Sequence, residues 1–192
     1  MATMTTWRSD DPAGPGLKAA RVVLGETGFR AVGRMVRTTD DGVFSASYRL
    51  VVGASGAVER LVVDTAGEDR ERQLTITRDD GGVWLADDGS GAARIDAGGA
   101  LDVDLAFSPV FNALPIRRLG LHREKSEHTV PMVFVALPEV TVEVTEPTYR
   151  TVRTGTDGDL AVVGFAAGDF AAEMTVDADG MVLDYPGIAL RV

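Results

Sequence analysis

The chain has 192 residues, a length that suits one domain or two small ones and is ample for a buried core. Apolar residues make up 45% of it, which excludes a disordered composition. The formal net charge is −10, from 19 basic and 29 acidic residues. This charge argues against binding to nucleic acid or to an anionic membrane, since both require a basic patch. Cysteine is absent, which excludes disulfides, thiolate metal sites and a cysteine nucleophile.

The first residues are polar and end in a run rich in proline and glycine, from Asp11 to Gly16. We therefore expect a flexible segment over residues 1–16 and a single β-rich domain over residues 17–192. No basic region is followed by an apolar stretch at the N-terminus, so no secretory signal is expected. No apolar run approaches the ~20 residues of a membrane-spanning helix. These features predict a cytoplasmic protein without stable membrane insertion.

Short segments that alternate apolar and polar residues follow, separated by Asp-Gly or glycine-rich turns. Segment 43–52 is the clearest, and its apolar alternation is Phe44, Ala46, Tyr48 and Leu50. About a dozen such strands with hardly any helix predict an all-β, mainly antiparallel fold. We expect a strongly curved sheet, or an open barrel or roll, with one or two short helical turns.

Segments 44–61 and 170–184 resemble each other weakly. In each, a strand led by phenylalanine meets a glycine turn and a partner strand. An internal duplication would produce this pattern, and so would any two antiparallel hairpins.

Segment 105–119 departs from the strand pattern. Ser108 followed by Pro109 is a helix-start signature, because the serine side chain can cap free N–H groups and proline loses only a donor that had no partner. Pro115 should end the helix by about Leu114, because it disfavours the helical conformation of the residue before it. One to two helical turns are therefore predicted, followed by a possible strand.

Asp102 and Asp104 lie two residues apart in a short predicted strand, so both should face the same side. Paired carboxylates can perform glycosidase acid–base catalysis at a separation of ~5 to 9.5 Å. They can also bind sugar hydroxyls, because carboxylates are strong hydrogen-bond acceptors. The alternative without a function is a strand with one solvated face.

Arg117 and Arg118 follow the predicted helix in an apolar setting. In an extended segment they would point to opposite faces, so one of them would lie against apolar surface. A charge there needs a partner, which is either a carboxylate, Asp102 or Asp104, or the polar head of a ligand. The residues alone leave both options open.

The chain contains no Gly-x-Ser-x-Gly motif, Walker loop or dinucleotide fingerprint. His122 and His128 lie in or beside a charged loop, and neither spacing nor context indicates a metal site, so both are expected at the surface. We therefore predict no catalytic residues, no metal and no cofactor.

Two motifs resemble those of a bacterial family described as "putative glycolipid-binding", formerly a domain of unknown function. The first is the run from Phe107 to Leu119, with Asn112 and Leu-Pro-Ile-Arg-Arg-Leu at its end; the family usually has threonine where this chain has Ala113. The second is the turn Asp-Tyr-Pro-Gly that contains Tyr185, after which Ala189 stands at a position that is aromatic in the family. The resemblance covers the chain from about Val22 onward.

The resemblance implies a curved sheet similar to those of bacterial lipoprotein carriers, and a lipid or glycolipid ligand. The first hypothesis is therefore non-catalytic binding of an amphipathic molecule, whose acyl chains lie in a cleft of the sheet and whose head meets Asn112, Arg117, Arg118 and Tyr185. The second is a hydrolase of a glycoside or ester that uses Asp102 and Asp104. The third is a structural or partner-binding role through a strand edge or a homodimer.

Overall fold

The computed structural model describes residues 2–11, 14–25, 28–155 and 158–192, and β-strands dominate it. The strands and the helix are β1 (Ala2–Arg8), β2 (Gly16–Gly25), β3 (Gly28–Thr39), β4 (Gly42–Val52), β5 (Val58–Ala66), β6 (Glu71–Arg78), β7 (Trp84–Asp87), β8 (Ala92–Ile95), β9 (Asp102–Leu105), α1 (Pro109–Arg118), β10 (Glu127–Thr129), β11 (Met132–Val135), β12 (Val142–Thr145), β13 (Thr148–Arg153), β14 (Ala161–Ala167), β15 (Phe170–Val176), β16 (Val182–Tyr185) and β17 (Ala189–Arg191).

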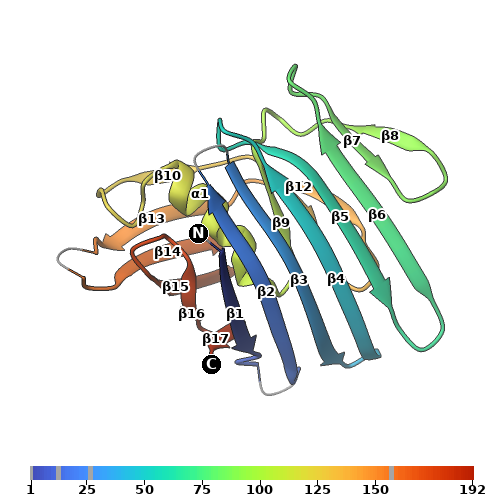
Figure 1. Ribbon diagram of the computed structural model, residues 1–192, viewed down its shortest axis with the longest axis horizontal. Helices are drawn as coiled ribbons and strands as arrows, with labels where there is room; N and C mark the ends of the chain where they lie inside the picture. The colour runs from blue at the N-terminus through green and yellow to red at the C-terminus, as the bar shows by residue number, and fades with distance from the viewer. Residues whose placement is uncertain (1, 12–13, 26–27, 156–157) are drawn as a thin grey trace.

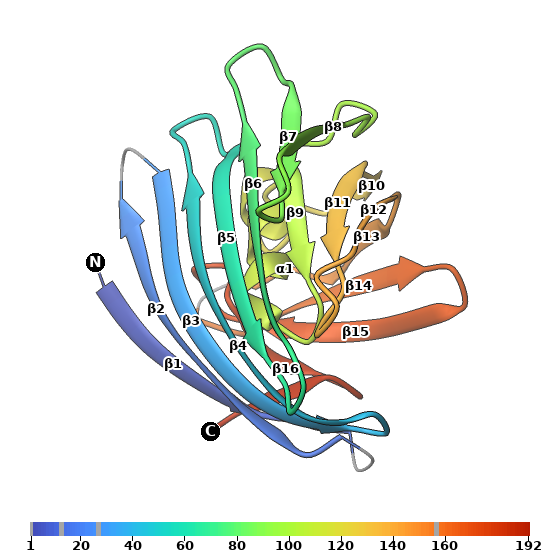
Figure 2. The same ribbon diagram turned by 90° about the vertical axis from the view of Figure 1, so that its right-hand side faces the viewer.

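Fourteen strands form one antiparallel sheet in the order β10-β13-β14-β15-β16-β17-β1-β2-β3-β4-β5-β6-β7-β8. A second sheet has the order β12-β11-β9, in which β9 and β11 are parallel. Figure 2 shows β1–β6 as a curved wall, with α1, β9 and β11 on its concave side. The prediction of a mainly antiparallel, strongly curved and open sheet is confirmed.

The alternation of side chains places the buried residues of β1–β6 on the concave face. In β4 the buried residues are the predicted set, Phe44, Ala46, Tyr48 and Leu50. They pack against β9, β11 and one side of α1 in a first core cluster. A second cluster, which includes Ile116, Tyr149 and Phe165, lies between α1 and strands β13–β16. The helix therefore separates two cores, with the strands of the large sheet on both sides (Figure 1).

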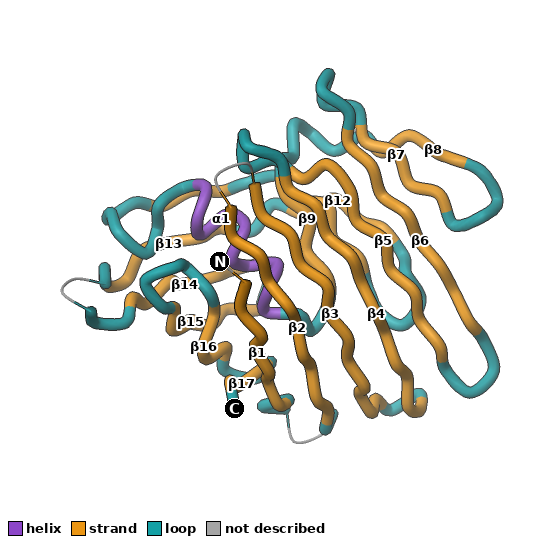
Figure 3. The backbone as a smooth tube through the Cα atoms, viewed as in Figure 1, coloured by secondary structure: helices purple, strands orange, loops and turns teal. Residues whose placement is uncertain are grey.

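Helix α1 is longer than predicted, because it continues through Pro115 to Arg118 (Figure 3). An interior proline costs about 3 kcal/mol. Every residue from Pro109 to Ile116 is buried, and full burial of one large apolar side chain contributes about 1.5–3 kcal/mol. The burial of several such side chains therefore outweighs the free-energy cost of Pro115. The helix ends at Arg118, and Gly120, two residues later, has a φ of 67°, the left-handed conformation that glycine adopts readily after a last helical turn.

The expected helix cap is also different. Ser108 is the N-cap residue and Pro109 occupies the first turn, as predicted, but the serine side chain makes no capping bond. Its hydroxyl donates instead to the Tyr48 hydroxyl oxygen, at 3.3 Å. Because Tyr48 belongs to β4, this bond ties the start of the helix to the curved wall.

Where a flexible segment was expected over residues 1–16, the structure has strand β1 at Ala2–Arg8 and the start of β2 at Gly16. Strand β1 pairs with both β2 and β17 and thereby joins the two ends of the chain in one sheet. Trp7 anchors it, since its ring is buried and its indole N–H donates to the Val182 carbonyl at 2.9 Å. Residues 12 and 13 of the expected loop lie outside the described residues. No helix in the described ranges has the length and apolar character needed to cross a membrane.

Candidate functional site

A cavity of about 440 Å³ lies between the small sheet and strands β14–β16 of the large one. Its volume is within the range of small-molecule sites. The cavity wall is mostly apolar, and its polar side chains come from separate elements. The lining residues are Asp104, Leu105, Ala106, Phe107, Ser108, Asn112, Met132, Phe134, Ala136, Leu137, Glu143, Thr145, Pro147, Phe165, Ala167, Phe170, Tyr185 and Ile188.

Asn112 enters the cavity wall from the first half of α1. The Tyr149 hydroxyl, which is buried, donates to the Asn112 Oδ1 at 3.0 Å. This bond fixes the amide and turns its NH₂ group away from Tyr149. Within the described ranges that NH₂ group has no hydrogen-bond partner, so it is available as a donor in the cavity.

Asp104 enters the wall from β9. Burial raises the pKa of its carboxyl to about 7, and a hydrogen bond from the Leu105 backbone opposes the shift only in part. The carboxylate has no ion-pair partner among the described residues. Its proximity also helps to raise the pKa of the Tyr185 hydroxyl, for which burial is the larger cause. Asp104 and Tyr185 are therefore two neighbouring polar side chains in a mostly apolar wall.

Three aromatic rings cluster on the side of the cavity formed by β14–β16. The ring centroids of Phe165 and Tyr185 are 6.1 Å apart, and Phe170 lies 6.1 Å from Phe165 and 6.2 Å from Tyr185. Phe170 is 41% exposed, so this ring marks the rim of the cavity. Large exposed rings at a rim can contact the apolar faces of a ligand.

Asp102 does not share the cavity with Asp104. Its carboxylate is fully buried and pairs with the Arg118 guanidinium, whose Nε also lies 3.5 Å from Oδ1. Burial raises the pKa of Asp102, and Arg118 opposes that shift. The predicted salt bridge is therefore present, and the expectation of a solvated strand face is wrong. The hydrolase hypothesis requires both carboxylates in one pocket, and the cavity lining includes Asp104 but not Asp102.

Arg117 and Arg118 lie in the last turn of α1 rather than in a strand, so they do not point to opposite faces. The Arg117 guanidinium donates to the Asp179 carbonyl in the turn between β15 and β16. Both arginines and Leu114 line a separate cleft of about 180 Å³. Of the predicted site residues, the structure thus brings Asp104, Asn112 and Tyr185 together and places Asp102, Arg117 and Arg118 at the other end of the helix.

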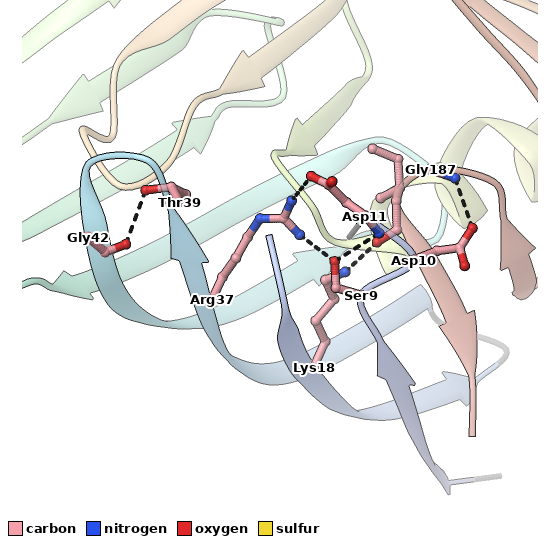
Figure 4. Close-up of polar contacts among 9 residues, drawn as sticks. Ser9, Asp10, Asp11, Lys18, Arg37, Thr39, Gly42 and Gly187 are labelled. Atoms are coloured by element: carbon pink, nitrogen blue, oxygen red, sulfur yellow. Dashed lines mark hydrogen bonds and ion pairs between the residues drawn. The ribbon is translucent and has the colours of Figure 1, made fainter. Parts of the chain in front are cut away.

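Sequence reasoning missed two buried cations behind the cavity wall, Lys18 and Arg37 (Figure 4). The Arg37 guanidinium stacks on the Phe107 ring at 4.1 Å, and it bonds Asp11 and Ser9 at 2.7 Å each. Such stacking on an aromatic face contributes about 0.5–2 kcal/mol. The interaction holds Phe107, a wall residue with a φ of 66°, in place.

Lys18 lies near Arg37 and contacts a second residue of the same wall, Ile188. Its Nζ donates to the Ile188 carbonyl at 2.7 Å, and burial, together with the nearby Arg37 charge, lowers its pKa to about 8. The Gly187 N–H donates to the Asp10 carboxylate at 3.1 Å (Figure 4). Side chains of β2 and β3 alternate between inward and outward positions, and Lys18 and Arg37 occupy inward ones. A charged residue at an inward position is the sequence signal that could have identified them.

His122 is buried, which corrects its expected surface position. Neither ring nitrogen has a hydrogen-bond partner within the described ranges. Burial and the nearby arginines Arg123 and Arg117 lower its pKa and favour the neutral ring. No group of three or more metal-ligating side chains is found in the part of the chain that the structure describes.

Comparison with solved structures finds the same architecture in other bacterial proteins. A DUF1089 family protein from Pseudomonas aeruginosa superimposes with a TM-score of 0.70 at 26% identity, over 91% of this chain and 92% of that one. A β-barrel-like protein of DUF1849 from Brucella abortus shares only 11% identity, with a TM-score of 0.58 over 99% of this chain and 93% of that one, and shows likeness of fold alone.

No curated protein matches the chain. A family model described as "Putative glycolipid-binding" matches residues 4–191, from β1 to β17. That match spans both motifs of the sequence, the helix with its flanking strand and the turn that contains Tyr185. The chain therefore belongs to the family described as "Putative glycolipid-binding".

Proposed function

We propose that the protein binds an amphipathic molecule with an uncharged, hydroxyl-bearing head, such as a glycolipid, without catalysing a reaction on it. The observation that carries this proposal is the cavity itself, whose wall is mostly apolar but holds Asp104, Asn112 and Tyr185. An apolar site with a few convergent polar groups is typical of small-ligand binding. The family description supports the same ligand class.

The charges of the cavity wall support an uncharged head. Asp104 and Glu143 are the charged residues of the lining, and both are acidic. Sugar hydroxyls donate hydrogen bonds that carboxylates accept strongly, whereas a phosphate or sulfate head would be repelled. The Asn112 amide adds a donor beside these acceptors.

The apolar part of the wall supports an acyl chain. Met132, Phe134, Ala136 and Leu137 supply one side and Phe165 with Phe170 the other. A chain between them removes apolar surface from water, which contributes about 25 cal/mol per Å². In this proposal Asp102, Arg117 and Arg118 position α1 instead of contacting the head. A cytoplasmic location and a homodimer stay predictions.

The experiment is calorimetric titration with octyl β-D-glucoside below its micellar concentration, beside octyl sulfate as an anionic head on the same chain. We expect the glucoside to bind and the sulfate to bind at least tenfold more weakly. Ala167→Trp should fill the cavity and abolish glucoside binding. Ala166→Trp is the matched control, because Ala166 is exposed on the other face of β14. Equal binding by the two variants, or preference for the sulfate, would refute the proposal.

A further inference from the structure

The convex face of β1–β5, opposite the cavity, carries exposed arginines. Six of them occupy outward positions of these five strands: Arg8, Arg21, Arg30, Arg34, Arg49 and Arg60. None of the six is ion-paired within the described ranges. We call this surface the arginine face. Its strands lie in front in Figure 1.

Strand register interleaves these arginines with aliphatic side chains. One row across the sheet reads Val23, Arg30, Val51, Arg60, and the next reads Met4, Arg21, Val32, Arg49, Val62. Met4 is 65% exposed and Val32 50%, and Leu17 and Val36 in the same face are 55% and 54% exposed. Each arginine of the two rows therefore has at least one aliphatic neighbour directly opposite it on an adjacent strand.

The charge of the arginine face is opposite to that of the whole chain. Strands β1–β5 contain two acidic residues, Glu59 and Asp64, although the chain holds 29 acidic and 19 basic residues. The turns that follow β3 and β5 hold acidic residues, Asp40 and Asp41 in the first and Glu68 and Asp69 in the second, at the end of the sheet away from Arg30 and Arg60. The net charge of −10 thus conceals a local cationic surface, which corrects the expectation that no basic patch exists.

We infer that the arginine face docks the protein on an anionic membrane surface. Guanidinium groups bind lipid phosphates, and each basic residue near an anionic bilayer strengthens binding. The interleaved valines and Met4 can enter the interface between head groups and acyl chains while the arginines reach outward. A single-strand nucleic-acid surface would instead need aromatic side chains for base stacking, and the two rows have none.

This inference is independent of the proposed ligand site, because the cavity lining comes from residues 104–188, whereas the arginine face lies on β1–β5. The experiment is sedimentation of the full chain with phosphatidylcholine vesicles, without and with about one-third phosphatidylglycerol. We expect binding only to the anionic vesicles and a decline with added salt. Each arginine should contribute about fivefold to the partition coefficient. The double variant Arg30→Gln with Arg49→Gln should therefore lower it about 25-fold.

Arg94→Gln with Arg153→Gln is the matched control, since it changes net charge equally at exposed positions of β8 and β13. It should bind as the parent chain does, and so should Ala167→Trp. Equal losses in the two double variants, or binding that ignores lipid charge, would overturn the inference. A dimer in size-exclusion chromatography that Arg30→Gln with Arg49→Gln dissociates, without vesicle binding, would assign the face to a second copy and overturn it as well.

Discussion

The two ends of α1 differ in what their polar side chains contact. At the first end, Ser108 and Asn112 are bonded to the neutral hydroxyls of Tyr48 and Tyr149 and border the cavity. At the last end, Arg118 is bonded to a buried carboxylate and Arg117 to a turn carbonyl. A contiguous sequence motif therefore contains two groups of polar residues, one that borders the cavity and one that fixes the helix to its neighbours.

The largest expected effect is at the last end of the helix. Arg118→Ala leaves the fully buried Asp102 carboxylate without its charged partner. Removing one member of a buried pair costs about 3–5 kcal/mol of unfolding free energy. Chemical denaturation should show this loss as a lower midpoint with an unchanged slope.

Arg117→Ala serves as the comparison. It removes one hydrogen bond to the Asp179 carbonyl, a contact exposed to solvent. The net contribution of such a bond is about 0.5–1.5 kcal/mol. If the two arginine variants lost equal stability, the distinction between a buried pair and a surface tether would be wrong.

Local sequence signals predicted the elements better than the site. Alternation located the strands of the curved wall, and Ser108 with Pro109 located the start of α1. The helix end was misplaced because tertiary burial outweighs the local preference of Pro115, and Gly120 was the correct stop signal. Strand β1 was missed because its order depends on pairing with β17, at the other end of the chain.

The Arg118–Asp102 ion pair was one of the two options that the sequence left open, because a charge in an apolar run requires either a carboxylate or a ligand as its partner. The cavity was not predictable, because its wall is assembled from segments more than eighty residues apart, from Asp104 to Ile188. The arginine face shows the opposite case. Its arginines alternate with buried residues in each strand, so their position on one face could be predicted from the sequence, although the net charge of the chain is negative.

A pH-dependent effect is expected at the first end of the helix, beside Asp104. The folded-state pKa of about 7 lies above the ordinary value of an unfolded aspartate, ~3.9. The folded state therefore binds the proton more tightly, and this group's contribution to stability is present below about pH 4 and is lost as pH rises toward 7.

Asp104→Asn should remove that dependence, because an amide does not titrate. Thermal unfolding between pH 4 and 8 measures the result: relative to the variant, the parent chain should lose stability as pH rises. Asp64→Asn is a suitable control, since it changes a partly exposed carboxylate of β5 outside the site. Parallel pH curves for the parent chain and Asp104→Asn would show that Asp104 is not a buried acid of raised pKa.

The smallest expected effect on folding is at the rim of the cavity. Phe170 is 41% exposed and contacts Phe165 and Tyr185 through its ring. Because an aromatic pair contributes about 0.5–1.5 kcal/mol and this ring is half open to solvent, Phe170→Ala should lower the unfolding free energy by at most about 1 kcal/mol. Binding of octyl β-D-glucoside should nevertheless weaken, because the ring is one side of the entrance. Val152→Ala, at a 38% exposed position of β13 outside the cavity lining, should change neither quantity. If glucoside binding survives Phe170→Ala but not Ala167→Trp, the ligand contacts the inner wall of the cavity and not its rim. The comparison between the two ends of α1 would then rest on Asp104 and Asn112 alone.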